Sequence, residues 1–158
     1  MQKITPCLWF DDQAEEAATF YVSLFKNSRI LNTSYYGEGS GRPAGSVLTV
    51  DFELEGVEHQ ALNGGPAFQF TEAISLSVST ESQEETDELW EKLTSDGGAP
   101  SMCGWLKDRF GLSWQIVPSV LGELLTDPDP EKANRVLQAM LGMRKIEIAE
   151  LQRAYDGQ

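Results

Sequence analysis

Histidine, cysteine and basic side chains are scarce in this chain. Its 158 residues include one histidine and two cysteines, and 12 Lys and Arg stand against 25 Asp and Glu, for a net charge of −13. A surface this acidic repels phosphate backbones and anionic lipid, which argues against nucleic-acid and membrane partners. No apolar run approaches the roughly 20 residues that span a bilayer, and residues 1–6 lack the apolar core of a signal peptide. We therefore expect a cytoplasmic protein.

The two cysteines, Cys7 and Cys103, fall at similar points in predicted strands of opposite halves. In a cytoplasmic protein we expect reduced thiols with packing roles, because that compartment does not favour structural disulfides. No base and no second cysteine stands beside either one in the sequence. Neither is therefore predicted to act as a nucleophile.

The chain repeats one pattern at an interval of 70 residues. Counting 70 residues on from the strand-like segment 4–10 reaches a second strand-like segment, 74–80, and a helical pattern follows each one. A repeat of this length predicts two packed copies of one supersecondary unit, and not a solenoid of short repeats. The corresponding helix positions are Gln13, Glu15 and Phe20 in the first copy and Gln83, Glu85 and Trp90 in the second.

The first copy predicts a strand, a helix and three further strands. Either Asp11 or Asp12 can cap the helix, since a carboxylate accepts hydrogen bonds from the first turn. The dipeptide Glu55-Gly56 fits a two-residue hairpin turn between the last two strands. The expected segments are strand 4–10, helix 13–25 and strands 29–36, 46–54 and 57–63.

The second copy follows the same plan and leads into a helical tail. Ser82 is the predicted N-cap of its helix, with Glu85 three residues on as in a capping box. Ile74, Leu76 and Val78 alternate along one strand and are expected to face the core. The expected segments are strands 73–79, 101–107 and 112–118, a tail helix capped by Asp129 and ended by Gly142, and a last helix 145–155.

These patterns predict an α+β fold of paired β-α-β-β-β modules with C-terminal helices, in a single domain. The first module covers residues 1–66, the second covers 72–118, and the tail covers 119–158. Two half-open sheets side by side would curl round a cleft, and small-molecule sites favour such clefts.

Side chains that alternate away from the core are the candidates for lining this cleft. If Gln115 faces the cleft, the neighbouring Trp114 packs on the helix side as core. Cys103 and Trp105 are expected to share a face and line the cleft. Such a cleft is neutral, part aromatic and part hydroxyl, which suits an uncharged or ring-bearing ligand. The predicted ligand-binding residues are Cys7, Trp9, His59, Asn63, Ser75, Cys103, Trp105 and Gln115.

Several polar residues also have a purely structural interpretation. His59, the only histidine, can be a half-exposed strand residue instead of a ligand or catalyst. Asn63 precedes two glycines, and turn chemistry explains it as well as ligand binding does. Lys107-Asp108-Arg109 is most simply a charged turn. The glycine-rich segment 37–41 opens no helix that would point at a phosphate, so it is no dinucleotide site, although it can act as a lid.

A family resemblance is carried by the segment 103–118, by the stretches 4–11, 61–66 and 87–90, and by the pair Phe20-Tyr21. The sequence resembles the PhnB-like branch of the vicinal oxygen chelate superfamily, the relatives of glyoxalase I, bleomycin-resistance proteins and extradiol dioxygenases. This branch is often labelled 3-demethylubiquinone-9 3-methyltransferase domain. The resemblance implies paired β-α-β-β-β modules and a homodimer whose partner completes the clefts.

The resemblance also implies positions for metal ligands, and this sequence departs from them. Metal-using members place three or four His, Glu or Gln ligands on strands that face the cleft. The corresponding positions here fall near Thr5 or Pro6, between His59 and Asn63, near Ala73 and on Gln115. Only Gln115 fits, and a lone neutral amide oxygen is a weak ligand. No glycine-rich strand-to-helix turn cradles S-adenosylmethionine either. We therefore predict no metal and no cofactor.

The leading hypothesis is a metal-free protein that binds a small neutral or aromatic molecule, as a carrier or by sequestration. One alternative is an enzyme of the superfamily. It would be either the methyltransferase of the family label, or a metal-dependent lyase or isomerase in which His59 and Gln115 meet a carboxylate of the dimer partner. A third reading is a purely structural dimer supported by the helical tail. The sequence identifies neither the ligand nor a catalytic residue.

Overall fold

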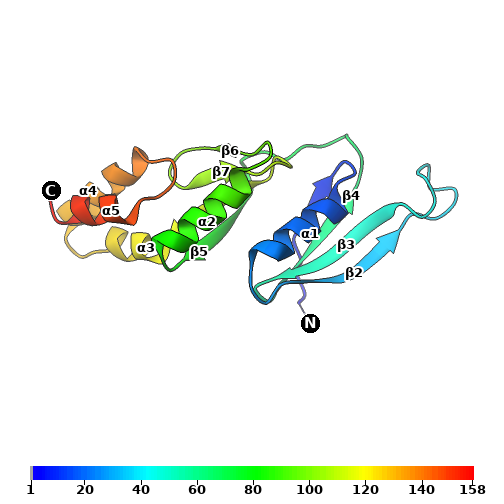
Figure 1. Cartoon of the computed structure of the whole chain (residues 1–158), viewed down its shortest axis with the longest axis horizontal. Helices are drawn as coiled ribbons and strands as arrows, with labels where there is room; N and C mark the ends of the chain where they lie inside the picture. The colour runs from blue at the N-terminus through cyan, green and yellow to red at the C-terminus, as the bar shows by residue number, and fades with distance from the viewer. Residues whose placement is uncertain (1) are drawn as a thin grey trace. The chain divides into compact units, whose positions relative to one another are not determined.

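The computed structural model describes residues 2–158, which form two compact units, residues 2–70 and residues 71–158. Each unit has one four-stranded sheet with a helix packed on one of its faces (Figure 1). We call the face under that helix the helix-covered face and the opposite one the helix-free face. This mixed architecture confirms the predicted α+β class and the β-α-β-β-β plan of each half.

The sheet of the first unit has the strand order β1-β4-β3-β2, with β1 parallel to β4 and the other neighbours antiparallel. The two-residue turn between β3 and β4 is the predicted one: Glu55 and Gly56 have φ values of 48° and 82°, which suits a tight hairpin. The elements are β1 (Cys7–Phe10), α1 (Ala14–Leu24), β2 (Arg29–Tyr35), β3 (Val47–Leu54) and β4 (Val57–Asn63).

Alternation along these strands separates a core from a helix-free face. The buried side chains on the helix-covered face pack against the small residues and Tyr21 of α1, and each large one contributes about 1.5–3 kcal/mol by burial. The residues between them, such as Cys7 and Trp9, point the other way. The buried apolar residues of these strands are Leu8, Phe10, Val50, Phe52, Leu54 and Ala61.

The amino terminus of α1 differs from the prediction. The residue before the helix is Gln13, and its side chain makes no capping bond. The side-chain oxygen Oδ1 of Asn63 instead accepts a hydrogen bond from the Ala14 amide at 2.8 Å. The prediction of a cap by Asp11 or Asp12 is therefore wrong, because a strand distant in sequence supplies the capping oxygen.

The second unit repeats this order, as β5-β8-β7-β6, and again only the first pair is parallel. Its helix begins as predicted, since Ser82 Oγ accepts from the Glu85 amide at 3.1 Å. Leu89, Trp90 and Leu93 form the buried stripe of that helix. The elements are β5 (Ser75–Thr80), α2 (Gln83–Thr94), β6 (Ala99–Pro100), β7 (Trp105–Lys107) and β8 (Ser113–Pro118).

Two expectations for this unit are wrong. Ile74 is 63% exposed instead of facing the core, because it precedes the strand, which begins at Ser75. The expected strand 101–107 is interrupted by a turn in which Cys103 has a φ of 59°. That left-handed conformation cannot continue a strand, so only residues 105–107 pair with β8.

The tail consists of α3 (Ser119–Leu125), α4 (Pro130–Leu141) and α5 (Ile148–Tyr155). Asp129 caps α4 and Gly142 ends it, as predicted. The last helix begins at Ile148, later than the expected residue 145. The apolar side chains of the tail pack against one another in a small core within this unit. The buried residues of this core are Leu121, Val136, Ile146 and Leu151.

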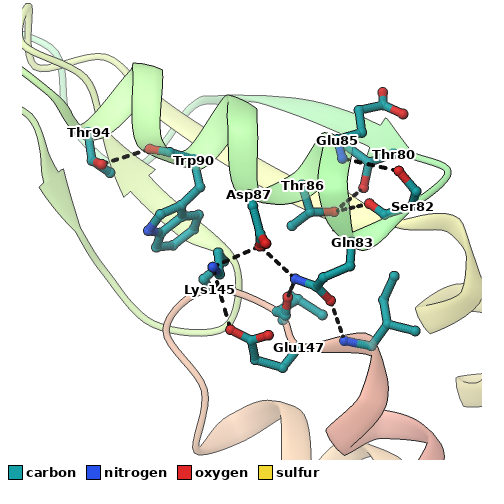
Figure 2. Close-up of polar contacts among 12 residues, drawn as sticks. Thr80, Ser82, Gln83, Glu85, Thr86, Asp87, Trp90, Thr94, Lys145 and Glu147 are labelled. Atoms are coloured by element: carbon teal, nitrogen blue, oxygen red, sulfur yellow. Dashed lines mark hydrogen bonds and ion pairs between the residues drawn. The ribbon is translucent and has the colours of Figure 1, made fainter.

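A set of polar contacts fastens the tail to α2 (Figure 2). The Gln83 carboxamide donates to the Ile146 carbonyl at 3.0 Å and accepts from the Ile148 amide at 2.7 Å. Beside it, Lys145 Nζ lies 2.7 Å from Asp87 Oδ1. The Gln83 side chain thus satisfies one backbone acceptor and one backbone donor at the start of α5.

Candidate functional site

The helix-free face of the second sheet gathers most of the polar and aromatic candidates. Strand pairing places Ser75, Ser113 and Lys107 side by side across β5, β8 and β7. The next row on the same face is Ser77, Gln115 and Trp105. Residues two apart on a strand point to the same face, so the two rows form one surface of hydroxyl, amide and indole groups with a single lysine.

Gln115 is fixed on this surface by a neutral contact. Its Nε2 donates to Ser75 Oγ at 3.0 Å. Trp105 lies opposite Gln115 on the neighbouring strand, so an indole flanks the amide. The neighbouring Trp114 is buried beneath α2, as predicted. Three of the predicted ligand-binding residues, Ser75, Trp105 and Gln115, are therefore brought together.

A cavity of about 480 Å³ opens beside these rows, lined in part by Glu72, Pro100, Ser101, Trp105, Lys107 and Ser113. Lys107 and Glu72 form an ion pair at its edge, and the Lys107 ammonium lowers the pKa of the Glu72 carboxyl. Ser113 is only 1% exposed, and its Oγ has no hydrogen-bond partner among residues 2–158. The cavity thus combines one cation, one anion, an indole and a buried hydroxyl.

Asp108, which the sequence places in a charged turn, is a buried hydrogen-bond acceptor. Its carboxylate is 2% exposed; Oδ1 accepts from the amides of Phe110 and Leu112, at 2.9 and 3.0 Å. Oδ2 accepts from Trp114 Nε1 at 2.9 Å. Asp108 therefore holds the turn before β8 and orients the indole under Gln115. The available signal was an Asp at the first position of the four-residue turn Asp108-Arg109-Phe110-Gly111.

The first sheet carries a related arrangement on its helix-free face. Cys7 pairs with Gln60 in the register in which Ser77 pairs with Gln115. Gln60 Nε2 donates to Asp51 Oδ1 at 2.9 Å, and the Cys7 thiol lies 3.5 Å from Gln60 Oε1. Gln60, Asp51 and His59 are among the residues that line a cavity of about 380 Å³. The repeat places Gln60 opposite the same strand position as Gln115, and an amide here could hydrogen-bond a ligand as the sequence suggests.

The surroundings of Cys7 oppose a thiolate. Burial, and secondly the negative charge of Asp51, raise the pKa of the Cys7 thiol. The nucleophile in cysteine chemistry is the thiolate. These surroundings therefore disfavour the thiolate form of Cys7.

His59 and Asn63 lie on the helix-covered face, away from Cys7 and Trp9. His59 is 7% exposed, and its ring stacks on Phe52 with 5.3 Å between centroids. Burial lowers the pKa of His59, partly offset by the hydrogen bond with the Val57 carbonyl. The expectation of a half-exposed histidine is wrong, because the alternation of β4 turns residues 59, 61 and 63 toward α1.

Asn63 has a structural task that neither sequence interpretation named. Besides capping α1 through Oδ1, its Nδ2 donates to the Val47 carbonyl at 3.1 Å. Both ends of the carboxamide are engaged within the first unit. The following Gly64 contacts Trp9 so closely that a Cβ there would lie 2.3 Å from the indole ring.

Trp9 and Cys103 have local partners as well. Trp9 Nε1 donates to the Gly65 carbonyl at 2.9 Å, and Phe68 meets its ring edge-on at 5.0 Å. Cys103 lies against the tail, since its amide donates to the Met143 carbonyl at 2.8 Å. The expectation that Cys103 shares a strand face with Trp105 is therefore wrong.

The described residues do not fit a metal ion or S-adenosylmethionine, the two groups that the family resemblance brings into question. Among residues 2–158, no three His, Cys, Asp or Glu side chains gather where a metal ion could be held. The two strand-to-helix turns, at 11–13 and 81–82, contain no glycine. Asn63 and Ser82 already cap the helices that follow them. A nucleotide-like cofactor such as S-adenosylmethionine therefore finds no backbone cradle at either turn.

No helix in the described part has the length and apolar character needed to cross a membrane.

Comparison with known proteins gives matches over most of the chain. The family model of 3-demethylubiquinone-9 3-methyltransferase matches residues 2–117. The PhnB protein from Bacillus cereus is 38% identical, with a TM-score of 0.69 over 75% of this chain and 100% of that one. Protein PA1353 from Pseudomonas aeruginosa is 22% identical, with a TM-score of 0.61 over 75% and 98%.

A further structural neighbour is the fosfomycin resistance protein FosX from Listeria monocytogenes. It is 17% identical and has a TM-score of 0.58 over 80% of this chain and 98% of that one. At this identity the likeness concerns the fold alone. No protein of curated function matches the sequence.

Proposed function

The chain belongs to the 3-demethylubiquinone-9 3-methyltransferase family, the PhnB-like group of the vicinal oxygen chelate superfamily, and from this premise we propose that it binds a small organic molecule without a metal ion. The ligand has an uncharged or aromatic body and rests on the helix-free face of the second sheet. The protein acts by sequestration or as a carrier.

The observation that carries this proposal is the Gln115–Ser75 pair beside Trp105. An amide and a hydroxyl hold a polar group by hydrogen bonds, while an indole provides a flat apolar surface for a ring. These groups are neutral, so they favour an uncharged contact over a divalent cation. Cys7 and Trp9, on the helix-free face of the first sheet, are proposed only as contacts for a ligand bound on that sheet. His59, Asn63 and Cys103 are not included, because the fold engages them elsewhere.

Methyl transfer and metal-assisted chemistry have weaker support. The strand-to-helix turns lack glycine, and His59 is stacked on Phe52 beneath α1, away from the surface that carries Trp9. A lyase or isomerase that needs the His59 imidazole as a ligand would have to displace this packing. We therefore favour binding over catalysis.

The proposal is tested by ligand titration of the metal-free protein. Small aromatic compounds are titrated in the presence of a chelator, and binding is followed by calorimetry. Gln115→Leu is expected to weaken binding about 10-fold, because it removes the amide while keeping the side-chain volume. Gln152→Leu, an exposed change in α5, is the matched control. Binding that needs an added divalent ion, or that ignores Gln115→Leu, contradicts the proposal.

We also propose that the protein is a cytoplasmic homodimer. The family resemblance supports the dimer, and the two free cysteines suit a reducing compartment. Sedimentation at micromolar concentration is expected to give twice the 17.5 kDa mass of the chain. A species of single-chain mass at all accessible concentrations would contradict the dimer.

A further inference from the structure

The buried hydroxyl of Ser113 is a polar group that finds no hydrogen-bond partner among residues 2–158. Ser113 occupies the middle of the row Ser75–Ser113–Lys107 and lines the 480 Å³ cavity. Its Oγ is shielded from solvent and has no partner among residues 2–158. Such a group is costly in a folded protein unless a ligand or a water satisfies it.

The ion pair of Lys107 and Glu72 crosses the strand that carries Ser113. Lys107 is on β7, Glu72 precedes β5, and β8 lies between these two strands. Lys107 and Ser75 are the register neighbours of Ser113 on either side. The ion pair therefore spans β8 at the position of Ser113.

The two partners of this ion pair are not equally fixed. Lys107 belongs to a paired strand, whereas Glu72 stands in the turn segment before β5. Their side chains are 45% and 62% exposed, and ion pairs this exposed add little stability. Glu72 is thus the exchangeable partner, and the Lys107 ammonium is the permanent charge of the cavity.

We propose that this cavity binds a small monocarboxylate with a flat apolar body. The ligand carboxylate takes the place of Glu72 at Lys107 Nζ. It also accepts a hydrogen bond from the Ser113 hydroxyl. Its body lies against Trp105 and Pro100. This inference rests on the proposed function, since it names the polar head of the ligand bound beside Gln115. No covalent step is involved.

A carboxylate fits these groups better than a neutral or cationic head. A neutral head would leave Glu72 paired with Lys107 at the edge of the cavity. A cationic head would pair with Glu72 and leave the Lys107 ammonium beside it as a repelling charge. A carboxylate satisfies Lys107 and Ser113 together, and hydrogen bonds to a charged acceptor are roughly twice as strong as neutral ones.

Benzoate and its neutral counterpart benzamide are the probes for this proposal. Both are titrated into the full chain at low ionic strength, and calorimetry gives the two dissociation constants. We expect benzoate to bind at least 10-fold more tightly than benzamide. Ser113→Ala should weaken benzoate about 10-fold and leave benzamide less affected, and Lys107→Met should abolish the preference for the anion.

Glu72→Gln gives a result that a merely structural role would not produce. It removes the competing carboxylate, so benzoate should bind more tightly to this variant than to the wild type. Lys92→Met is the matched control for Lys107→Met, because Lys92 forms an ion pair of similar exposure with Glu88 on α2. Its benzoate affinity should equal that of the wild type.

Three results would overturn the inference: no binding of benzoate, equal binding of benzoate and benzamide, or benzoate binding unaffected by Ser113→Ala and Lys107→Met. In each case the proposed function still stands if other compounds bind in a Gln115-dependent way. It fails separately if no panel compound depends on Gln115.

Discussion

At the scale of single residues, buried and half-buried polar side chains hold turns, helix starts and the tail in place. Asn63 and Gln83 each satisfy two backbone groups that are distant from them in sequence, and Asp108 satisfies two amides and an indole within six residues. Such contacts are invisible to periodicity, which sees these residues only as polar positions in turns or helix starts. The sequence predicted the strands around Gln115 but not the carboxylate that positions the neighbouring Trp114.

Asp108→Asn should destabilise the protein by about 2–4 kcal/mol, because an amide nitrogen would then face an N–H donor where Oδ2 or Oδ1 now accepts. Urea unfolding followed by tryptophan fluorescence measures the change. Asp96→Asn is the control, since Asp96 is an exposed carboxylate in the same unit. Equal effects of the two substitutions would contradict the role assigned to Asp108.

The stability of the protein should depend on the protonation of His59. Burial lowers the folded-state pKa of His59 below its ordinary value of 6.5. The unfolded chain therefore binds the proton first as the pH falls, so the free energy of unfolding should decrease below about pH 6.5 and stay constant above it. One pH unit lower, the loss reaches at most about 1.4 kcal/mol.

His59→Gln removes this titration, and His59 is the only histidine. The difference in unfolding free energy between wild type and variant, measured in urea between about pH 7.5 and 5.5, should shrink as the pH falls. A difference that is constant over this range would show that His59 titrates alike in the folded and unfolded states.

At the scale of elements, the sequence predicted the order of strands and helices well because turn residues and helix caps are local signals. The capping box at Ser82, the Glu55-Gly56 turn and the Asp129 cap each lie within a few residues of the element they define. The failures have non-local causes. The cap of α1 comes from Asn63, and Cys103 turns toward the tail, where Met143 accepts its amide hydrogen bond.

The attachment of the tail to α2 gives a prediction for a whole element. Gln83→Ala removes both hydrogen bonds to the start of α5 (Figure 2), so the amides of α5 should exchange with solvent faster, by about 10-fold. Hydrogen exchange followed by NMR measures this for each helix. Gln152→Ala, on α5 itself, should leave α5 exchange nearly unchanged. Unaltered protection of α5 in Gln83→Ala would contradict the role of Gln83.

At the scale of the whole molecule, one plan is used twice with different neighbours on the helix-free face. Gln60 and Gln115 occupy corresponding register positions, yet Asp51 stands opposite the first and Trp105 opposite the second. The repeat was readable from the sequence. The pairing of each glutamine with an acidic or an aromatic neighbour depends on strand register, which periodicity does not supply. This difference is why we place the ligand on the second sheet.

The most direct measurement is an NMR titration of chelator-treated, nitrogen-15-labelled protein with small aromatic compounds, with the Gln115 side-chain amide and the Trp105 indole as reporters. Our account predicts that at least one compound shifts both signals in a saturable way before any metal is added. Signals that stay still for every compound, or that move only once a divalent ion is supplied, would contradict it.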